Sequence, residues 1–308
     1  MMSDGPKLLL IDGNNMAHRV FWANQNLAHK GRSTGLIYGF FKQLISLNNR
    51  CPDHFRVIAW DAKGGSYRRV EESKAGVEAG IVPEHYKQSR KEQKRTPEME
   101  ADIESLFEQM DQVRDGLALT STLQVTMEGV EGDDILYSYA KWAEEHDGES
   151  IIISTDQDFY QCLSDKTTIF DAMKKETWTP ERFRLEFGFG PELWVDAGAI
   201  MGEVGPSKDN IFGVNKWGPK TTYKYVREHG GVDAIRAALE QKAKITKTEQ
   251  NFLNSRERLR LALSLKQMDK VPNIPRTRVI HKPNPKDIES FFLRFGMASL
   301  LKDIWRFA

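Results

Sequence analysis

The stretch KLLLID at residues 7–12 decides the fold. It is a continuous apolar run that ends in an aspartate, and the pattern returns in RVIAWD at 56–61 and in SIIISTD at 150–156. Continuous apolar runs of about five residues predict strands that are buried on both faces, as in a parallel sheet covered by helices. We therefore expect these three segments to be strands of one parallel sheet.

Helical patterns separate these strands. Apolar residues recur at helical spacing in three segments, and one of them follows Pro97, a favoured first-turn residue. Strands that alternate with helices predict an α/β domain, here a mostly parallel central sheet flanked by helices. We place this domain at about 1–190. The helical segments are 34–47, 97–113 and 132–145.

The rest of the chain, residues 191–308, is predicted to be a helical region. Helices are expected over 234–239 and 256–265, and an extended basic linker over 272–285. The last segment, 288–307, has the pattern of an amphipathic helix, which we expect to pack on the main domain.

Acidic residues follow the ends of the predicted strands. Asp12, Asp61 and Asp156 occupy that position, and a fourth short strand over 124–127 leads into the acidic segment 128–134. Helix capping explains one carboxylate of this kind. It does not explain the whole group, because so many carboxylates at one sheet edge cost several kcal/mol of repulsion unless cations neutralise them. The pattern predicts a metal site at this edge.

A cluster of carboxylates without His or Cys favours the hard cations Mg²⁺ or Mn²⁺ over Zn²⁺. So many carboxylates indicate two ions, an arrangement that suits in-line attack of water on a phosphodiester. No side-chain nucleophile is then needed.

Charge is segregated along the chain, although 44 basic and 44 acidic residues cancel. Residues 63–95 hold nine basic against five acidic residues, whereas 128–158 hold ten acidic against one basic. Residues 216–227 and 270–286 carry bases and no acid. A net charge of zero by itself argues against a nucleic-acid partner, but here it is the sum of strongly basic and strongly acidic segments. For any single charged segment, a solvated helix face remains the alternative explanation.

Two observations concern the location of the chain. The first apolar run is cut off by Asp12, so we expect neither a signal peptide nor a membrane span. The two cysteines, Cys51 and Cys162, have no metal-ligand spacing, which favours a reducing, cytoplasmic compartment.

Five ordered motifs resemble those of the 5′-nuclease superfamily, the flap endonuclease and 5′→3′ exonuclease family, and most closely its phage members such as the phage ribonuclease H. The resemblance spans about 7–230. It implies a PIN-like fold with a helical arch at about 66–96 and a helix-hairpin-helix-type region at about 211–228. The motifs are LIDGNN (10–15), AWD (59–61), GVEGDD (129–134), STDQD (154–158) and MGE with DNIFGV (201–214).

The resemblance assigns nine acids to metal. Two features depart from the family pattern: Glu203 stands where the family usually has Asp, and Asp209 follows it by six residues instead of three. The extra residues either loop out or shift Asp209 and weaken the second site. The assignments are Asp12, Asp61, Glu131 and Asp133 around one ion, Asp156, Asp158 and Asp209 at the second, and Asp134 and Glu203 as outer or water-mediated ligands.

The arch is expected to grip a single-stranded 5′ end. Tyr86, Lys87 and Arg90 match the family's Tyr-Lys-x-x-Arg pattern. The resemblance implies that Lys87 stabilises the scissile phosphate, that Arg90 assists it, and that Tyr86 stacks on a base. Arg68 and Arg69 are predicted to contact DNA as well. A solvated surface helix is the alternative.

The segment from Gly213 to Lys220 resembles the family's hairpin, whose Gly-rich turn, including Gly218, offers backbone N–H groups to a phosphate. Lys220 and Lys224 are expected to follow the duplex backbone without reading sequence. The resemblance also implies a monovalent cation such as K⁺ in the hairpin. A Gly/Pro-rich connector between helices is the alternative.

The resemblance thus implies a monomeric, Mg²⁺-dependent 5′-nuclease, an exonuclease and flap endonuclease with RNase H activity. Its expected substrates are branched or nicked duplex DNA with a 5′ single strand and RNA:DNA hybrid, as in primer removal during DNA replication or repair, with replication proteins as partners. Two alternatives stay open: an RNA-only PIN-type ribonuclease, and a non-catalytic or weakly active structure-specific DNA-binding protein.

Overall fold

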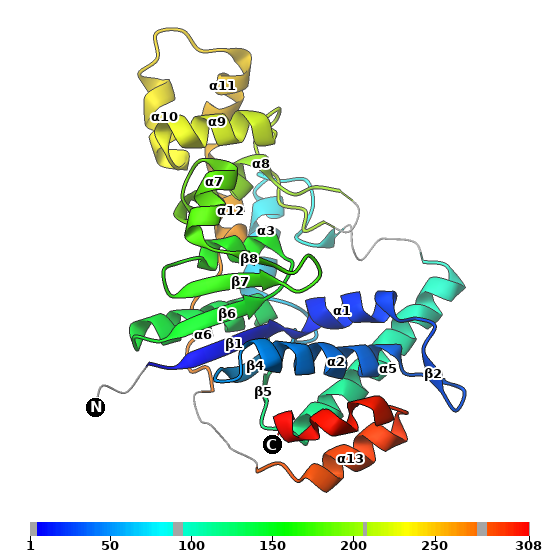
Figure 1. Ribbon diagram of the computed structural model, residues 1–308. Helices are drawn as coiled ribbons and strands as arrows, with labels where there is room; N and C mark the ends of the chain where they lie inside the picture. Colours follow the sequence, from blue (N-terminus) through cyan, green and yellow to red (C-terminus); the bar gives the residue numbers. More distant parts are fainter. Residues whose placement is uncertain (1–4, 89–94, 206–207, 276–281, 308) are drawn as a thin grey trace.

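The computed structural model describes residues 5–88, 95–205, 208–275 and 282–307. Six strands form one sheet in the order β5-β4-β1-β6-β7-β8, and all neighbours run parallel except β7 and β8 (Figure 1). The prediction of an α/β fold with a mostly parallel central sheet is confirmed. The strands are β1 (Lys7–Asp12), β4 (Phe55–Ala59), β5 (Leu123–Val125), β6 (Glu149–Ile153), β7 (Thr167–Asp171) and β8 (Glu176–Trp178).

The central strand β1 is buried on both faces, as its unbroken apolar run predicted. Leu9 and Ile11 pack with α1 (Gly13–Ala23), α2 (Gly35–Arg50) and α5 (Pro97–Ala118). Leu8 and Leu10 face the opposite layer, which includes α6 (Gly132–Glu145) and the 3₁₀ helix η1 (Gln157–Cys162). Each buried Leu or Ile contributes about 1.5–3 kcal/mol, so the sheet holds its register firmly.

Short strand-to-helix turns place acidic residues at one edge of this sheet. Asp12 is the N-cap of α1 and accepts a hydrogen bond from the Asn15 N–H. Asp156 is the N-cap of η1, and Glu131 is the residue before α6. Because β1 and β6 are parallel neighbours, the helices that follow them begin at the same edge.

The helical region returns to the core through α12, which packs against α8 and α3 (Figure 1). Helices α9, α10 and α11 project away from the sheet on one side (Figure 1). The remaining elements are the β2/β3 hairpin (Ala28–His29, Arg32–Ser33), α3 (Tyr67–Glu78), α7 (Pro180–Phe187), η2 (Pro191–Leu193), α8 (Trp194–Met201), α9 (Pro219–His229), α10 (Val232–Glu240), α11 (Lys247–Leu253) and α12 (Arg256–Lys266).

The end of the chain differs from the single amphipathic helix predicted over 288–307. It forms α13 (Pro285–Arg294) and a 3₁₀ helix, η3 (Ala298–Phe307), separated by Gly296 in the left-handed region. A glycine at positive φ ends a helix at little cost. The two pieces pack on the core as expected, with Phe292 and Phe307 against Phe41 of α2.

In the part of the chain that the structure describes, no helix combines the length and the apolar character that a membrane crossing requires. The division into domains at about residue 190 stays a prediction.

Candidate active site

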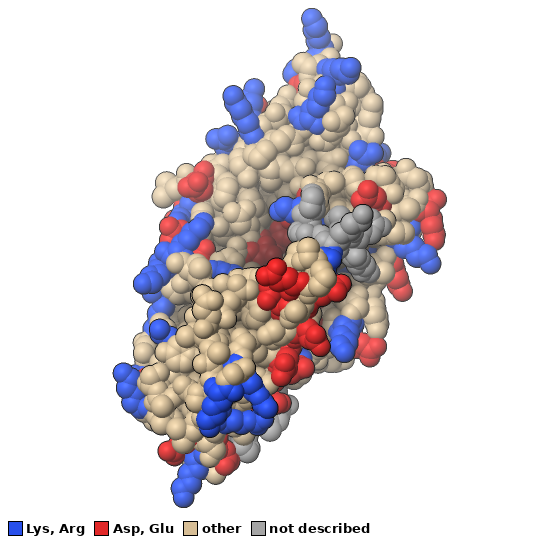
Figure 2. Space-filling model, turned by 90° about the vertical axis from the view of Figure 1, so that its right-hand side faces the viewer, with Lys and Arg blue, Asp and Glu red and all other residues tan. Residues whose placement is uncertain are grey.

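A pocket of about 360 Å³ lies where β1, β4 and β6 end, at the edge predicted for the site. Acidic side chains lie at the bottom of a hollow on the face drawn in Figure 2. Lys87, Lys266 and Arg69 also line the pocket. Tertiary structure therefore brings together seven of the nine predicted acids, from segments far apart in the sequence: Asp12, Asp61, Glu131, Asp133, Asp156, Asp158 and Asp209.

Hydrogen bonds fix three of these carboxylates at the ends of the strands. The second oxygen of Asp12 accepts from the Ser154 hydroxyl at 3.0 Å. Asp61 Oδ1 accepts from the Gly132 N–H at 2.8 Å, which ties the end of β4 to the start of α6. Asp156 Oδ1 accepts from the backbone N–H of Asp158 at 2.9 Å.

Burial and mutual repulsion raise the pKa values of Asp12 and Asp133. Burial, followed by the charges of Asp61 and Asp156, raises the pKa of Asp12 to about 7, although hydrogen bonds oppose the shift. Burial and the neighbouring carboxylates also raise the pKa of Asp133 well above its ordinary value. Within the described residues, neither Asp12 nor Asp133 has a cation at ion-pair distance. Added positive charge here would relieve the repulsion.

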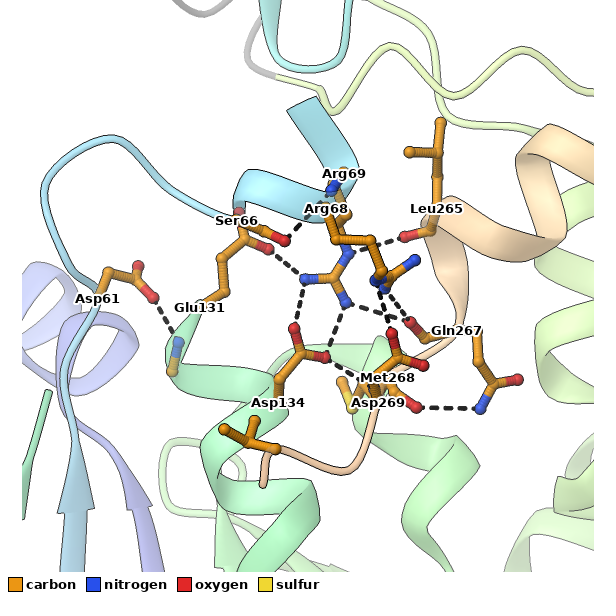
Figure 3. Close-up of polar contacts among 12 residues, drawn as sticks. Asp61, Ser66, Arg68, Arg69, Glu131, Asp134, Leu265, Gln267, Met268 and Asp269 are labelled. Atoms are coloured by element: carbon orange, nitrogen blue, oxygen red, sulfur yellow. Dashed lines mark hydrogen bonds and ion pairs between the residues drawn. The ribbon is translucent and has the colours of Figure 1, made fainter. Parts of the chain in front are cut away.

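Glu131 and Asp134 share one buried guanidinium, that of Arg69 (Figure 3). Arg69 is only 4% exposed. Its five hydrogen bonds reach Glu131, both oxygens of Asp134, and the backbone carbonyls of Leu265 and Gln267. Thus α3, the start of α6 and the end of α12 meet at a single side chain.

Three residues that were predicted to bind DNA or metal make their contacts inside the protein at this junction. Arg69 cannot bind DNA, because its donors are spent inside the protein. Arg68 is paired with Glu72 and Asp269 and donates to backbone carbonyls near the end of α12, so it too serves the fold. Asp134 does not line the pocket, since its carboxylate is turned to Arg69.

Lys87 enters the pocket and lies 2.7 Å from Glu131 Oε1. Burial acts to raise the pKa of Glu131, but Lys87 and Arg69 outweigh it and lower that pKa. The Lys87 backbone has a φ of 56°, an uncommon value for a residue with a side chain, and its N–H donates to the Asp209 carbonyl at 2.9 Å. This link brings the predicted arch to the loop that carries Asp209.

Tyr86 does not have the position predicted for a base-stacking residue. It is 7% exposed, and its hydroxyl donates to Asp209 Oδ2 at 3.1 Å and lies 3.4 Å from Glu131. Burial and the two carboxylates raise the pKa of this phenol, so it stays protonated. Arg90, which was predicted to assist Lys87 at the scissile phosphate, lies outside the described residues.

The unusual spacing before Asp209 forms a loop. Glu203 and Ile211 pair as an isolated antiparallel bridge, so the chain after the extra residues returns beside the chain before them. Asp209 then lines the pocket, whereas Glu203 does not. The carboxylate of Glu203 instead lies 2.7 Å from Lys266 and 3.2 Å from Lys208.

Lys266, the last residue of α12, was missed by the sequence analysis. Its ammonium lies 3.0 Å from Asp158 Oδ1 and 2.7 Å from Glu203 Oε2. Burial acts to lower the pKa of Lys266, but the two carboxylates outweigh it and raise that pKa, so the lysine is charged. Burial, partly offset by Lys266, raises the pKa of Asp158 to about 6. The only sequence signal was a lysine at the end of a predicted helix, a common and uninformative feature.

The predicted hairpin residues lie away from the pocket. Gly218 is the N-cap of α9, and Lys220 and Lys224 are exposed on that helix. Gly213 packs closely on the end of α8, where a Cβ would meet backbone atoms at 2.4 Å. Trp217 is buried and donates to the Thr248 carbonyl at 2.9 Å, so it anchors the hairpin to α11. Their contacts with DNA stay predictions.

The donor chemistry of the pocket suits a divalent cation at the end that contains Asp12 and Asp133. Carboxylate oxygens are the preferred ligands of hard cations, and these two acids carry charge that no described cation balances. In the described part of the chain, no three Asp, Glu, His or Cys side chains converge closely enough to enclose a metal as they stand. Ligation would therefore require small side-chain rotations.

Comparison with protein families and curated relatives gives a consistent result. The model of the 5′-3′ exonuclease N-terminal resolvase-like domain matches residues 7–188. DNA polymerase I of Bacillus subtilis is 33% identical over 246 residues, which cover 78% of this chain and 25% of that protein. The thermostable DNA polymerase I of Thermus thermophilus is 28% identical over 299 residues, which cover 96% and 33%. The chain thus spans about a quarter to a third of the length of these relatives.

Solved structures share the fold. The phage T5 5′-exonuclease with bound zinc superimposes with a TM-score of 0.70 and 26% identity, over 98% of this chain and 99% of that one. The catalytic core of Rad2 in complex with DNA substrate gives a TM-score of 0.55 over 99% and 93%, and at 14% identity it supports the fold alone. Divalent metal ions and DNA are thus found in structures similar to this one.

Proposed function

The chain belongs to the 5′-3′ exonuclease family, a family of metal-dependent nucleases, and on that premise we propose that it is a structure-specific 5′-nuclease that hydrolyses phosphodiesters with Mg²⁺. The observation that carries the proposal is the acidic pocket, where seven carboxyl groups lie beside Lys87 at the edge where the strands end. Mn²⁺ is expected to replace Mg²⁺, since both prefer oxygen ligands.

Asp12, Asp61, Asp133 and Asp156 are the residues that would hold the ion, with Glu131 beside them. A bound divalent ion lowers the pKa of its water and stabilises charge on the phosphate. The protein's own part is to fix the carboxylates: the hydrogen bonds from Ser154 and from the Gly132 N–H orient Asp12 and Asp61 before any ion arrives. These hydrogen bonds keep both side chains at the strand ends, so that local rotations are enough to bring their oxygens to a bound ion.

Lys87 is the residue proposed to contact the scissile phosphate. It is half-buried at the pocket and pairs with Glu131. We propose that the ammonium leaves Glu131 when substrate binds and donates to a non-bridging phosphate oxygen, which frees Glu131 to bind the cation. Arg90 is proposed to assist it from the same segment.

Exposed bases on α9 are proposed to hold the duplex. Lys220, Lys224 and Arg227 are exposed on this helix, which carries no acid in its first turn. Contacts from such side chains to phosphates add affinity without sequence preference. A K⁺ ion in the hairpin is a further part of the proposal that rests on the resemblance alone.

The proposed substrates are nicked or branched duplex DNA with a 5′ single strand and RNA:DNA hybrid, and the proposed role is RNA-primer removal in replication or repair. The support is that the curated relatives are DNA polymerases I. On the same support, we propose replication proteins as its partners.

The test is cleavage of 5′-flap, nicked and RNA:DNA substrates with Mg²⁺ and with EDTA. Asp12→Asn should abolish cleavage, whereas the exposed control Asp111→Asn on α5 should retain it. Binding in Ca²⁺ should survive in both variants. Cleavage of none of the substrates by the unaltered protein would contradict the proposal; binding without cleavage would instead support the non-catalytic alternative.

A further inference from the structure

The two ends of the acidic pocket differ in charge compensation. At one end, Asp12, Asp61, Asp133 and Asp156 have no Lys or Arg within ion-pair distance among the described residues. At the other end, the ammonium of Lys266 contacts both oxygens of Asp158, at 3.0 and 3.1 Å. The same atom lies 2.7 Å from Glu203.

The position of Lys266 is fixed by the packing of α12. The side chain is 9% exposed, and its methylene stem passes Gly198 of α8, where an added Cβ would come within 3.7 Å of the stem. Its carbonyl accepts from Gln161, whose own amide oxygen receives the Met268 N–H at 2.9 Å. The backbone at the helix end is therefore tied to η1, and the burial of the stem keeps the ammonium beside Asp158 and Glu203.

Asp158 and Glu203 are two of the acids that the resemblance placed at or near a second divalent ion, together with Asp156 and Asp209. A third, Asp209, is engaged by the Tyr86 hydroxyl at 3.1 Å. The residues at this end thus do not fit a second ion, because a fixed positive charge already lies between their carboxylates and would repel another cation.

We propose that Lys266 replaces the second divalent ion, so that the protein binds one divalent ion, at the Asp12–Asp133 end of the pocket. This inference rests on the proposed function, since it assumes that the pocket takes a divalent cation. In this protein the ammonium of Lys266 is shared between the carboxylates of Asp158 and Glu203, and only the first group of acids responds to metal.

Counting bound Mn²⁺ by electron paramagnetic resonance tests this directly. The metal-free full chain is titrated with Mn²⁺, and the free-ion signal gives the bound number without any assay of activity. About one ion per chain is expected for the unaltered protein, and about two for Lys266→Met, which keeps the apolar stem but removes the charge. Lys208→Met is the matched control, because Lys208 contacts the same Glu203 at 3.2 Å with a side chain that is 54% exposed; this variant should still bind about one ion.

A second pair of variants decides the question even if Lys266→Met does not fold. Asp158→Asn should leave the number of bound ions unchanged, whereas Asp12→Asn should lose the ion. Two ions bound to the unaltered protein, one ion bound to folded Lys266→Met, or loss of an ion in Asp158→Asn would each overturn the inference. Binding of no ion at all would overturn it together with the metal dependence of the proposed function, so the two failures can be told apart.

Discussion

Replacement of Arg69 by leucine is the sharpest test of how the pocket is held together. The substitution leaves a shorter, apolar side chain and removes a guanidinium that makes five hydrogen bonds to Glu131, Asp134, Leu265 and Gln267. Two buried carboxylates then lose their shared cation. Only Glu131 keeps another described cationic partner, Lys87.

The magnitude follows from the burial of the group. Removing one partner of a buried ion pair costs about 3–5 kcal/mol, because the remaining charge stays desolvated without compensation. The neighbouring Arg68 is a natural control. Its side chain is 29% exposed, and partly exposed ion pairs contribute about 0–1 kcal/mol. Arg68→Leu should therefore destabilise the protein much less, even allowing for its bonds to backbone carbonyls.

Urea denaturation followed by circular dichroism measures the difference. Arg69→Leu should lower the midpoint by roughly 1 M or more, given the steep denaturant dependence of proteins of this size. Adding Asp134→Leu to Arg69→Leu should restore part of the loss, because an unpaired buried charge is removed with it. A midpoint for Arg69→Leu equal to that of Arg68→Leu would refute the reasoning that Arg69 is the structural centre of this junction.

Three further predictions concern the pocket and the hairpin. Lys87→Ala should lower single-turnover cleavage by about 10²–10³-fold and change DNA affinity little, since the proposed contact forms at the reacting phosphate; an equal loss in both measurements would contradict this. Lys220→Ala with Lys224→Ala should reduce the salt dependence of duplex binding by a slope of about 2, and an unchanged slope would remove these lysines from the interface. Glu249→Gln should destabilise the α9–α11 unit at pH 7 by about 1–3 kcal/mol. Burial acts to raise the pKa of Glu249, but Lys242 and other hydrogen-bond partners outweigh it and lower that pKa to about 2. The ionised carboxylate therefore stabilises the fold fully above pH 4.5, and this stabilisation is lost as the pH falls towards 2. Thermal melting at pH 7 and pH 3 would show the difference shrinking at the lower pH; a constant difference would point to lost packing instead.

The sequence predicted correctly those features that depend on short stretches of residues. Apolar runs that end in aspartate predicted the parallel strands β1, β4 and β6 and the edge at which their acids meet, because parallel strands expose the same end on the same side. The loop before Asp209 was among the outcomes foreseen from its spacing. Only the structure decided whether Asp209 would reach the pocket: Glu203 pairs with Ile211, and Asp209 lines the pocket.

At the junction of α3 with α6, residue type alone did not reveal which basic side chains are buried inside the protein. Basic and aromatic residues such as Arg68, Arg69 and Tyr86 are typical of surfaces that bind nucleic acid. The local sequence does not distinguish an exposed arginine from a buried one that joins three segments of the chain. The acids that bury Arg69 are more than sixty residues away along the chain. The terminal helix was misjudged for a related reason, because the break at Gly296 is decided by backbone geometry and not by the apolar pattern.

By itself, then, the sequence determined the fold class, the acidic edge and the family motifs, since hydrophobic period and residue type act over a few neighbouring positions. Only the tertiary structure decided which charges compensate one another. Electrostatic energy depends on distance and burial, and these were set when α12 returned to the core and placed Lys266 between Asp158 and Glu203. The same packing leaves Asp12 and Asp133 without a described cation at ion-pair distance and marks their end of the pocket for a metal ion.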